Sequence, residues 1–482
     1  MATETLYLEY TEDAGSSHKF YEVVIDDTQM TIRYGRIGES GQSSSSSFAT
    51  FEAAKKAAEK KAAEKRKKGY ADAVMGVRQR KARTITRRPI VSSAAPSSRS
   101  SAPIYKAPTV WKFASGSAAF GIYVNEKACW MGNQDGSVFA LDHEGKVLNQ
   151  YRLPEGVKCL VADQRWIYAG CDNGNVYDLT GKVTRIAYEV NESVDIYWLD
   201  IWDAFLAVSD EQGNVLVGNY EDESHWAQKS NGSGGWMVRA DEKGVYHGHS
   251  NGVTCYSLTD GAKLWESKTK GGVLFGWQEK EAVYAGCGDS KVYAFGKDGS
   301  SKVVYNCDGT IYSCATAEGG KFVFAGDSYS SIYCFDEAGT RLWKLSTGCG
   351  SALSMQYFQD RLYIVTSDGS FACIDVSEQS IEEAKQGNAK QAVAQKAPAA
   401  VAVANTAHLD TTSDTSTGIL LKCVKENSKL RVKVESGGYH SDWNVQFPKD
   451  LRQEGVQYIV NEIVESASGG FYRIVGDIKK VV

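Results

Sequence analysis

Residues that could catalyse a reaction are few in this sequence of 482 residues. His247 and His249, in YHGHSNG, are two positions apart, so both would lie on one side of a strand and could hold a metal ion. No third ligand stands at a characteristic distance, and a pair that lines a turn is the alternative. No nucleophile with its base and no phosphate-binding loop occurs at a diagnostic spacing. We therefore predict no catalytic residue, no bound metal and no cofactor, although a channel site could assemble from distant segments.

A short basic segment is the first candidate for a binding function. Six cations occur within eleven residues, namely Arg78, Arg80, Lys81, Arg83, Arg87 and Arg88. Such a run binds nucleic acid by releasing counterions, without sequence preference. The alternative, which the sequence supports equally, is that this segment is only a soluble tether between domains.

Aromatic residues, some beside cations, form two further candidates. Aromatic side chains are enriched where proteins bind partners, and a first set comprises Trp198, Trp202, Trp236 and Trp277. The alternative for this set is packing on inner strands. Aromatics interleaved with cations suit a nucleic-acid or peptide platform, and the second set comprises Tyr439, Trp443, Lys449 and Arg452. For Trp443 the alternative is a place in the core.

The first set belongs to a segment that repeats one motif seven times, from residue 109 to residue 376. Clear copies read WMGNQDGSVFALD, YAGCDNGNVYDLT and YAGCGDSKVYAFG. The residue before the second apolar run recurs every 38 to 40 positions, at Gly136, Gly174, Gly213, Gly252, Ser290, Ser330 and Gly369. A period this regular, with apolar runs divided by tight turns, predicts a seven-bladed β-propeller of four-stranded blades. Carboxylates before the turn are expected to accept Asx-type hydrogen bonds, as at Asp135, Asp172, Asp289 and Asp368.

The repeats also predict how the ring closes. Trp226, Trp265 and Trp343 mark the outer strand of three repeats, where an indole can wedge between neighbouring blades. A similar outer-strand sequence, TVWKFASGSA with Trp111, precedes the first repeat, and no such strand follows the seventh. We therefore expect Val110–Ala114 to complete the last blade.

The motif Y-A-G-x-x-D/N-G-x-V-Y-A-x-D, followed by L-W, resembles PQQ-like propeller repeats, which are similar in kind to WD40 repeats. Enzymes of that family bind a quinone cofactor and calcium in the channel of an eight-bladed ring. This chain has seven repeats and no adjacent pair of cysteines. The resemblance therefore implies a binding scaffold without the cofactor.

Residues 1–76 are predicted to form a separate α+β domain. LYLEY, FYEVVID and QMTIRYGRIG alternate as strands do, and FEAAKKAAEKKAAEKRKK has the apolar stripe of a helix. Thr50 is the expected N-cap of this helix, and Gly69 is expected to close it.

This domain resembles the WGR family through three motifs: HKFYE at 18–22, RYGRIG at 33–38 and KKGY at 67–70. WGR domains occur in DNA-damage-activated poly(ADP-ribose) polymerases and in bacterial regulators. In the polymerases the name-giving Trp stacks at a DNA break and the Arg helps to hold phosphate. Here Tyr34 replaces that Trp and Arg36 is retained, so the resemblance implies nucleic-acid contacts by these two, with Lys19 and Arg33 beside them. Alternatively, Tyr34 and Arg36 hold the sheet against its helix.

The other segments follow from composition and pattern. Residues 77–108 are a linker rich in Ser, Pro and Arg. Residues 377–417 are of low complexity, and EQSIEEAKQGNAKQAVAQKA, at 378–397, is expected to form a short helix. Residues 418–482 contain five short strands, which predicts a small β-barrel of OB or SH3 type and unassigned family.

The distribution of charge indicates a class of partner, and the cysteine content indicates in which cellular compartment the protein occurs. The net charge is −5, but residues 1–108 contain 19 Lys and Arg against 12 Asp and Glu, which suits contact with a polyanion. The eleven cysteines form no short-range framework, which fits a reducing environment. MATETLYLEY lacks the blocks of a signal peptide, and no apolar run reaches the ~20 residues of a membrane helix. We expect a cytoplasmic protein, nuclear in a eukaryote, with no membrane contact.

Three functions from different classes remain. In the first, the chain is a non-catalytic scaffold whose ring binds a protein partner, while the WGR domain and the basic segment contact nucleic acid. In the second, it is a DNA-binding regulator or damage sensor that acts through the WGR domain. The third, an enzyme with its site in the channel, ranks last. The identity of the partner and the oligomeric state do not follow from the sequence.

Overall fold

A computed structural model describes residues 3–11, 18–36, 42–72, 105–181, 183–190, 196–386, 393–396, 410–413 and 418–482. The chain divides into two compact units: the N-terminal domain, and a larger unit that holds the ring and the C-terminal barrel. The described residues are mainly in β-strands, as predicted.

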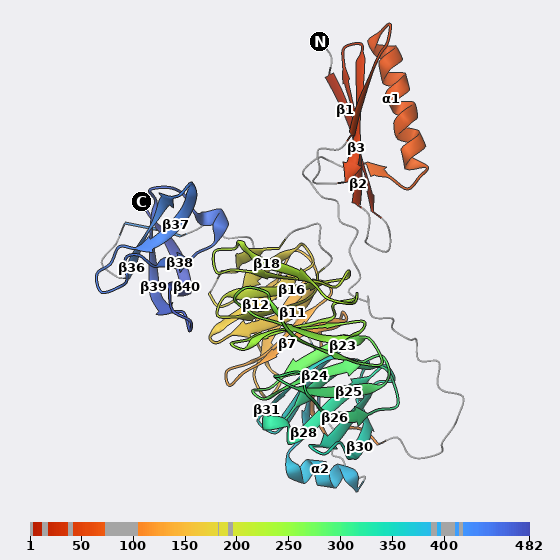
Figure 1. The fold of residues 1–482 in the computed structure, drawn as a ribbon, viewed down its shortest axis with the longest axis vertical. Coiled ribbons are helices and arrows are strands. Elements are labelled where there is room, and N and C mark those ends of the chain that lie inside the picture. The colour runs from red at the N-terminus through yellow and green to blue at the C-terminus, as the bar shows by residue number, and fades with distance from the viewer. Residues whose placement is uncertain are drawn as a thin grey trace. The chain divides into compact units, whose positions relative to one another are not determined.

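The N-terminal domain is an antiparallel sheet with one helix along one face (Figure 1). The sheet order is β4-β3-β2-β1-β5. Its elements are β1 (Thr3–Thr11), β2 (His18–Asp26), β3 (Gln29–Arg36), β4 (Gln42–Ser47), α1 (Phe51–Arg66) and β5 (Ala71–Asp72). Thr50 caps α1 as predicted, since its hydroxyl accepts a hydrogen bond from Ala53 N. Three alanines one turn apart, Ala54, Ala58 and Ala62, let the helix lie close to the sheet.

The repeats form seven blades, as predicted, and the inner strand of each blade contacts the inner strands on both sides. Blade 1 contains β7 (Ala119–Val124), β8 (Cys129–Asn133), β9 (Ser137–Leu141) and β10 (Val147–Arg152). Blade 2 contains β11 (Val157–Asp163), β12 (Trp166–Cys171), β13 (Asn175–Asp178) and β14 (Arg185–Glu189). Blade 3 contains β15 (Ile196–Trp202), β16 (Phe205–Asp210), β17 (Asn214–Gly218) and β18 (Ser224–Lys229). Blades 4 and 5 are β19 (Met237–Asp241), β20 (Gly244–His249), β21 (Gly252–Tyr256), β22 (Lys263–Lys268); and β23 (Val273–Gln278), β24 (Ala282–Cys287), β25 (Lys291–Gly296), β26 (Ser301–Asn306). Blade 6 is β27 (Ile311–Thr316), η1 (Glu318–Gly320), β28 (Phe322–Asp327), β29 (Ser331–Asp336) and β30 (Arg341–Ser346).

The seventh blade confirms the predicted closure. It contains β31 (Ala352–Phe358), β32 (Arg361–Thr366) and β33 (Ser370–Asp375), and β6 (Thr109–Ala114) pairs antiparallel with β33. Trp111 Nε1 donates to His143 O of blade 1 at 2.8 Å. Trp226 and Trp265 make the same bond to a carbonyl 32 residues ahead, on Leu258 and Lys297. One interaction therefore links successive blades and also joins the last blade to the first.

Two elements lie where low-complexity chain was expected. Within the described residues, the helix predicted over 378–397 is present only as α2 (Glu378–Lys385). The prediction is wrong for β34 (Val393–Lys396), which is a strand that pairs parallel with β6. Pairing covers the outer edge of β6, which would otherwise expose unpaired backbone groups. A second short strand, β35 (Thr411–Thr412), pairs with the barrel.

The C-terminal residues form the predicted five-stranded barrel, drawn in blue in Figure 1. Its elements are β36 (Ile419–Glu426), β37 (Lys429–Val434), β38 (Asn444–Gln446), η2 (Lys449–Leu451), β39 (Gln457–Glu465) and β40 (Phe471–Val481). The sheet runs β36-β37-β38-β40-β39 and closes through β39 and β36, with β38 and β40 parallel. This Greek-key order is that of the OB fold and decides between the two barrel types.

The repeated turn has a conformational cause. All seven aligned residues have a positive φ, from 62° at Ser330 to 144° at Gly252. Glycine adopts this region at little cost, whereas serine at positions 290 and 330 is strained. Of the four turn carboxylates, Asp135 and Asp368 accept the predicted hydrogen bonds from Ser137 N and Ser370 N. The other two carboxylates have different contacts from those predicted: Asp172 forms an ion pair with Lys158, and Asp289 accepts a hydrogen bond from the Tyr293 hydroxyl.

Ser290→Gly should therefore stabilise the ring by roughly 0.5–1 kcal/mol, because Ser290 has a φ of 64°. Ser301→Gly makes the same chemical change in an exposed strand position of the same blade and should destabilise by a similar amount. Thermal unfolding of both variants would measure the two signs. Equal destabilisation would contradict the strain at Ser290.

Candidate nucleic-acid and partner-binding sites

A cationic cleft lies between the sheet and the helix of the N-terminal domain. Tyr34 is 43% exposed, and its ring stacks with that of Tyr21, their centroids 6.3 Å apart. Lys65 Nζ lies 4.5 Å from the Tyr21 ring centroid and 5.9 Å from that of Tyr34. The Tyr34 hydroxyl donates to Gln42 Oε1 at 3.0 Å, which fixes the ring at the edge of the cleft.

The cleft measures about 350 Å³ and its charge is mostly positive. Its lining residues are Tyr21, Ile32, Tyr34, Ser44, Lys61, Glu64, Lys65 and Lys68. Burial, with repulsion from Lys68, Lys19 and Lys61, lowers the pKa of Lys65 below its ordinary value. A bound anion would relieve that repulsion, so the cleft is suited to a phosphate group beside a stacking ring.

Of the residues predicted to bind nucleic acid, those that the structure describes do not share one surface. Tyr34 pairs with Tyr21 in the sheet, and Arg36 pairs with Lys19, so these four positions lie on one face. Arg33 lies on the other face, where its Nε bonds Glu22 Oε2 at 2.7 Å and its guanidinium covers Phe20. The Arg36 side chain lies outside the described residues, as do Arg78, Arg80, Lys81, Arg83, Arg87 and Arg88.

Three lysines of the cleft, Lys61, Lys65 and Lys68, are absent from the predicted site residues. The sequence pattern indicates Lys65 and Lys68 only as the basic end of a helix and assigns no role to Lys61. Lys61 and Lys65 are one turn apart on α1, beside the buried Ala58 and Ala62, and Lys68 lies in the turn that follows the helix. The spacing of Lys61 and Lys65 is the signal that could have identified them.

The channel of the ring contains a second cavity, of about 360 Å³, lined by inner strands. Three of the four predicted tryptophans meet there: Trp198, Trp202 and Trp277. The fourth, Trp236, stacks instead on Tyr197 at 3.9 Å. Arg239 Cζ lies between 5.3 and 5.8 Å from the rings of Trp277, Phe275 and Trp198, so the aromatic faces surround a guanidinium of this chain.

The two histidines are buried among polar side chains rather than arranged as ligands. His247 Nδ1 is 2.6 Å from Ser230 Oγ, and His249 Nε2 is 2.9 Å from Thr254 Oγ1. Burial and the neighbouring His249 lower the pKa of His247 to about 3, so it is neutral at physiological pH. Within the described part of the chain, no three His, Cys, Asp or Glu side chains group as a metal site would require. All eleven cysteines are described, and all are free thiols.

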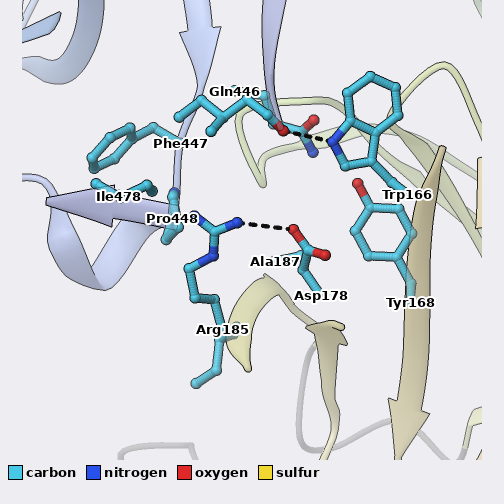
Figure 2. A pocket seen from close by; sticks show the side chains of 11 residues that line it. Trp166, Tyr168, Asp178, Arg185, Ala187, Gln446, Phe447, Pro448 and Ile478 are labelled. Atoms are coloured by element: carbon cyan, nitrogen blue, oxygen red, sulfur yellow. Dashed lines mark hydrogen bonds and ion pairs between the residues drawn. The ribbon is translucent and has the colours of Figure 1, made fainter. Parts of the chain in front are cut away.

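The barrel contacts the ring through a buried arginine. Arg473 Nη1 lies 2.7 Å from Asp163 Oδ2, and its guanidinium is 3.7 Å from the Trp166 ring centroid. Trp166 Nε1 donates to Ile474 O. A small cavity of about 30 Å³ remains beside this anchor, where Arg185 and Trp166 of the ring face Gln446 and Pro448 of the barrel (Figure 2). The space is enough for a water molecule and little more.

The contact between barrel and ring involves the cations of the second predicted set but not its aromatic residues. Lys449 Nζ donates to Asp222 O of the ring, and Arg452 Nη2 donates to Glu221 O. Tyr439 and Trp443 cluster instead with Tyr472, with ring centroids 5.6 and 5.1 Å away. The two cations therefore have a partner within this chain.

The fold and sites define a protein with a WGR-type domain, a seven-bladed ring and an OB-type barrel. Residues 4–77 match the WGR domain family, and residues 249–422 match the repeat family described as outer membrane protein assembly factor BamB. The chain therefore carries a WGR domain and a PQQ-like propeller. No curated protein matches the chain. Among solved structures it is similar to the computationally designed Ika8 protein, with 13% identity, a TM-score of 0.47, and coverage of 56% of this chain and 100% of that one.

No helix among the described residues is both long enough and apolar enough to cross a membrane.

The buried Asp200 in the channel predicts how the stability of the ring depends on pH. Burial raises the pKa of Asp200 to about 6, against an ordinary 3.8, and the nearby Arg239 opposes this rise. Because the folded pKa lies above the unfolded one, the ring loses stability as the pH rises through 6. Asp200→Asn should remove that loss, which is worth up to about 3 kcal/mol, and should raise the melting temperature more at pH 8 than at pH 5.

Asp260→Asn is the matched control, on an exposed turn. Hydrogen bonds from Ser257 and Ala262 N lower the pKa of Asp260, so the control should lose rather than gain stability at pH 8. Parallel melting curves at pH 5 and 8 would show this opposition. A gain for Asp200→Asn that does not depend on pH would contradict the assignment.

Proposed function

We propose that this chain is a non-catalytic scaffold whose propeller binds a protein partner while its WGR domain and basic segment contact nucleic acid. The observation that carries the proposal is the cationic cleft, in which Lys65 lies over Tyr21 and beside the exposed Tyr34. Stacking rings and lysines together are how proteins hold nucleic acid without reading its sequence. The basic segment 78–88 follows the domain closely in the chain and adds six cations.

For the ring, the proposal rests on how its polar residues are used. Carboxylates of several blades accept hydrogen bonds from turn backbone, as Asp135, Asp210, Asp327 and Asp368 do. Tryptophans hold blade to blade. Such a ring is a rigid platform, and its channel cavity, rich in tryptophan, supplies a surface of the kind that partners contact.

The cleft can be tested by titrating the full chain with blunt and nicked duplexes at several salt concentrations. We expect Lys61→Gln, Lys65→Gln and Lys68→Gln together to weaken binding about tenfold or more. The slope of log K against log salt should become shallower, by up to about 0.9 for each phosphate that the lysines no longer neutralise.

A matched control carries Lys56→Gln, Lys60→Gln and Lys67→Gln. These lysines lie on the side of the helix away from Ala54, Ala58 and Ala62. The total charge changes equally, so a general electrostatic effect would weaken both variants alike. Equal weakening in both would show that the cleft is not the site.

The second candidate function, a sensor of DNA breaks, is favoured by the exposure of Tyr34 at the edge of the cleft. A larger ring there should stack better on an exposed terminal base pair. Tyr34→Trp should therefore increase the preference for nicked or blunt DNA over closed circular DNA, measured by competition. An unchanged preference, with general binding retained, would leave the scaffold as the better proposal.

A further inference from the structure

A short acidic turn of the ring lies on the barrel. It comprises residues 219–223, between β17 and β18, and reads Asn-Tyr-Glu-Asp-Glu. Asn219 Oδ1 accepts hydrogen bonds from Glu221 N and Glu223 N, both at 3.0 Å, and Asp222 has a φ of 59°. The turn is therefore held in one conformation by its own hydrogen bonds.

The aromatic ring of the turn is stacked flat on the barrel. Tyr220 and Phe471 have ring centroids 3.9 Å apart and planes inclined by 3°. Aromatic pairs in cores more often meet offset or edge to face. A parallel stack at this distance is the arrangement in which a nucleic-acid base lies on an aromatic side chain.

The carboxylates of the turn meet cations of the barrel. Glu221 Oε1 lies 3.0 Å from Arg431 Nε, and Glu223 accepts from Lys429 at 2.8 Å and Arg431 at 3.2 Å. Asp222 Oδ2 lies 3.6 Å from Lys449 Nζ. Three consecutive anions of one short segment therefore each lie beside a cation of the barrel, next to a stacked ring.

The strand order of the barrel identifies which of its faces the ring covers. In OB folds, the face of the second and third strands, with the loops between strands 1 and 2 and between strands 4 and 5, binds oligonucleotides. The corresponding parts here are β37, β38, and the loops 427–428 and 466–470. Lys429 and Arg431 lie on β37, Asn444 on β38 donates to Glu221, and Ala467 N and Ser468 N donate to Asp203 of the ring.

Two of the three carboxylates in the contact carry a cost of desolvation, whereas for Glu223 burial is outweighed by Lys429 and Arg431, which lower its pKa. Burial raises the pKa of Glu221 even though Arg431 opposes the rise, and it raises the pKa of Asp222 to about 6 against the attraction of Lys449. Burial likewise lowers the pKa of Arg452. These charges are paired but poorly hydrated, and such pairs contribute less to stability than their number suggests. The anchor at Arg473 and Asp163 lies outside the turn, so the barrel can remain attached when the turn leaves.

We propose that the C-terminal barrel carries a binding site for single-stranded nucleic acid, and that the acidic turn 219–223 occupies this site as an internal mimic. Tyr220 stands in for a base on Phe471, and the three carboxylates stand in for phosphates on Lys429, Arg431 and Lys449. An acidic peptide shares part of this chemistry. The flat stack and the barrel face that is covered favour nucleic acid. The site is separate from the cationic cleft of the N-terminal domain.

The test uses the full chain with Lys61→Gln, Lys65→Gln and Lys68→Gln as background, which removes the cleft from the comparison. In this background, Tyr220→Ala, Glu221→Gln and Glu223→Gln should increase the affinity for a labelled oligothymidylate of about 15 nucleotides at least tenfold at about 100 mM salt. A control with Tyr329→Ala, Glu126→Gln and Glu242→Gln makes the same three types of change at other exposed positions of the ring and should leave the affinity unchanged.

Two further arms locate the site. Adding Lys429→Gln and Arg431→Gln to the turn variant should abolish the gain. Ultraviolet crosslinking followed by mass spectrometry should place the oligonucleotide on the peptide that contains Phe471 and Tyr472. If the triple change at the turn prevents folding, Tyr220→Ala alone removes the stacked ring and should give a smaller gain of the same sign.

Three outcomes would overturn the proposal. The first is an affinity of the turn variant no higher than that of the control. The second is a gain that survives removal of the Lys429 and Arg431 charges. The third is binding of a peptide with the sequence of residues 219–223 but not of the oligonucleotide, which would assign the face to an acidic peptide. None of these depends on whether the cleft binds duplex DNA.

Discussion

Closure of the ring by β6 is the constraint on which the larger unit depends. The strand comes from residues 109–114 and pairs with residues 370–375, so the two ends of the propeller sequence are joined in one sheet. Trp111 carries the link on to blade 1 by the same indole-to-carbonyl bond that joins blades within the chain. Once the ring is closed, every inner strand has two neighbours, which sets the width of the channel. The cavity around Arg239 and the position of the acidic turn both depend on this rigid frame.

Local pattern explains why the fold could be predicted from the sequence. The seven aligned turn residues all need a positive φ, so glycine recurs at a fixed period and marks each blade. Trp111 revealed the closing strand because its neighbours repeat an ending found in three blades. The five barrel strands were likewise visible as apolar runs, and only their order, with β38 parallel to β40, needed the structure. The strand β34 could not be predicted, because its pairing depends on a free edge far away in the sequence.

The sites were predicted less well, because they depend on which face a side chain takes and on which segments meet. Strand alternation alone separates Arg33 from Tyr34. Helical spacing places Lys61 and Lys65 together, and Lys68 joins them from the turn after the helix. No local signal links Arg473 to Asp163, or Lys449 and Arg452 to the turn at 219–223, since each pair is more than 200 residues apart. The aromatic and cationic pattern that predicted a partner surface could not show that Lys449 and Arg452 bond carbonyl oxygens of this chain's own ring.

The closing strand also determines when the propeller can be completed during synthesis. Among the strands of the propeller, β6 leaves the ribosome first, and its partner β33 follows about 260 residues later. At roughly 5–20 residues per second, this delay is about 13 to 50 seconds. Through that interval, six blades can form in succession while the first strand waits without a sheet. The long separation in sequence makes ring closure a late and slow step, and the nascent chain has unpaired edges until the seventh blade is made.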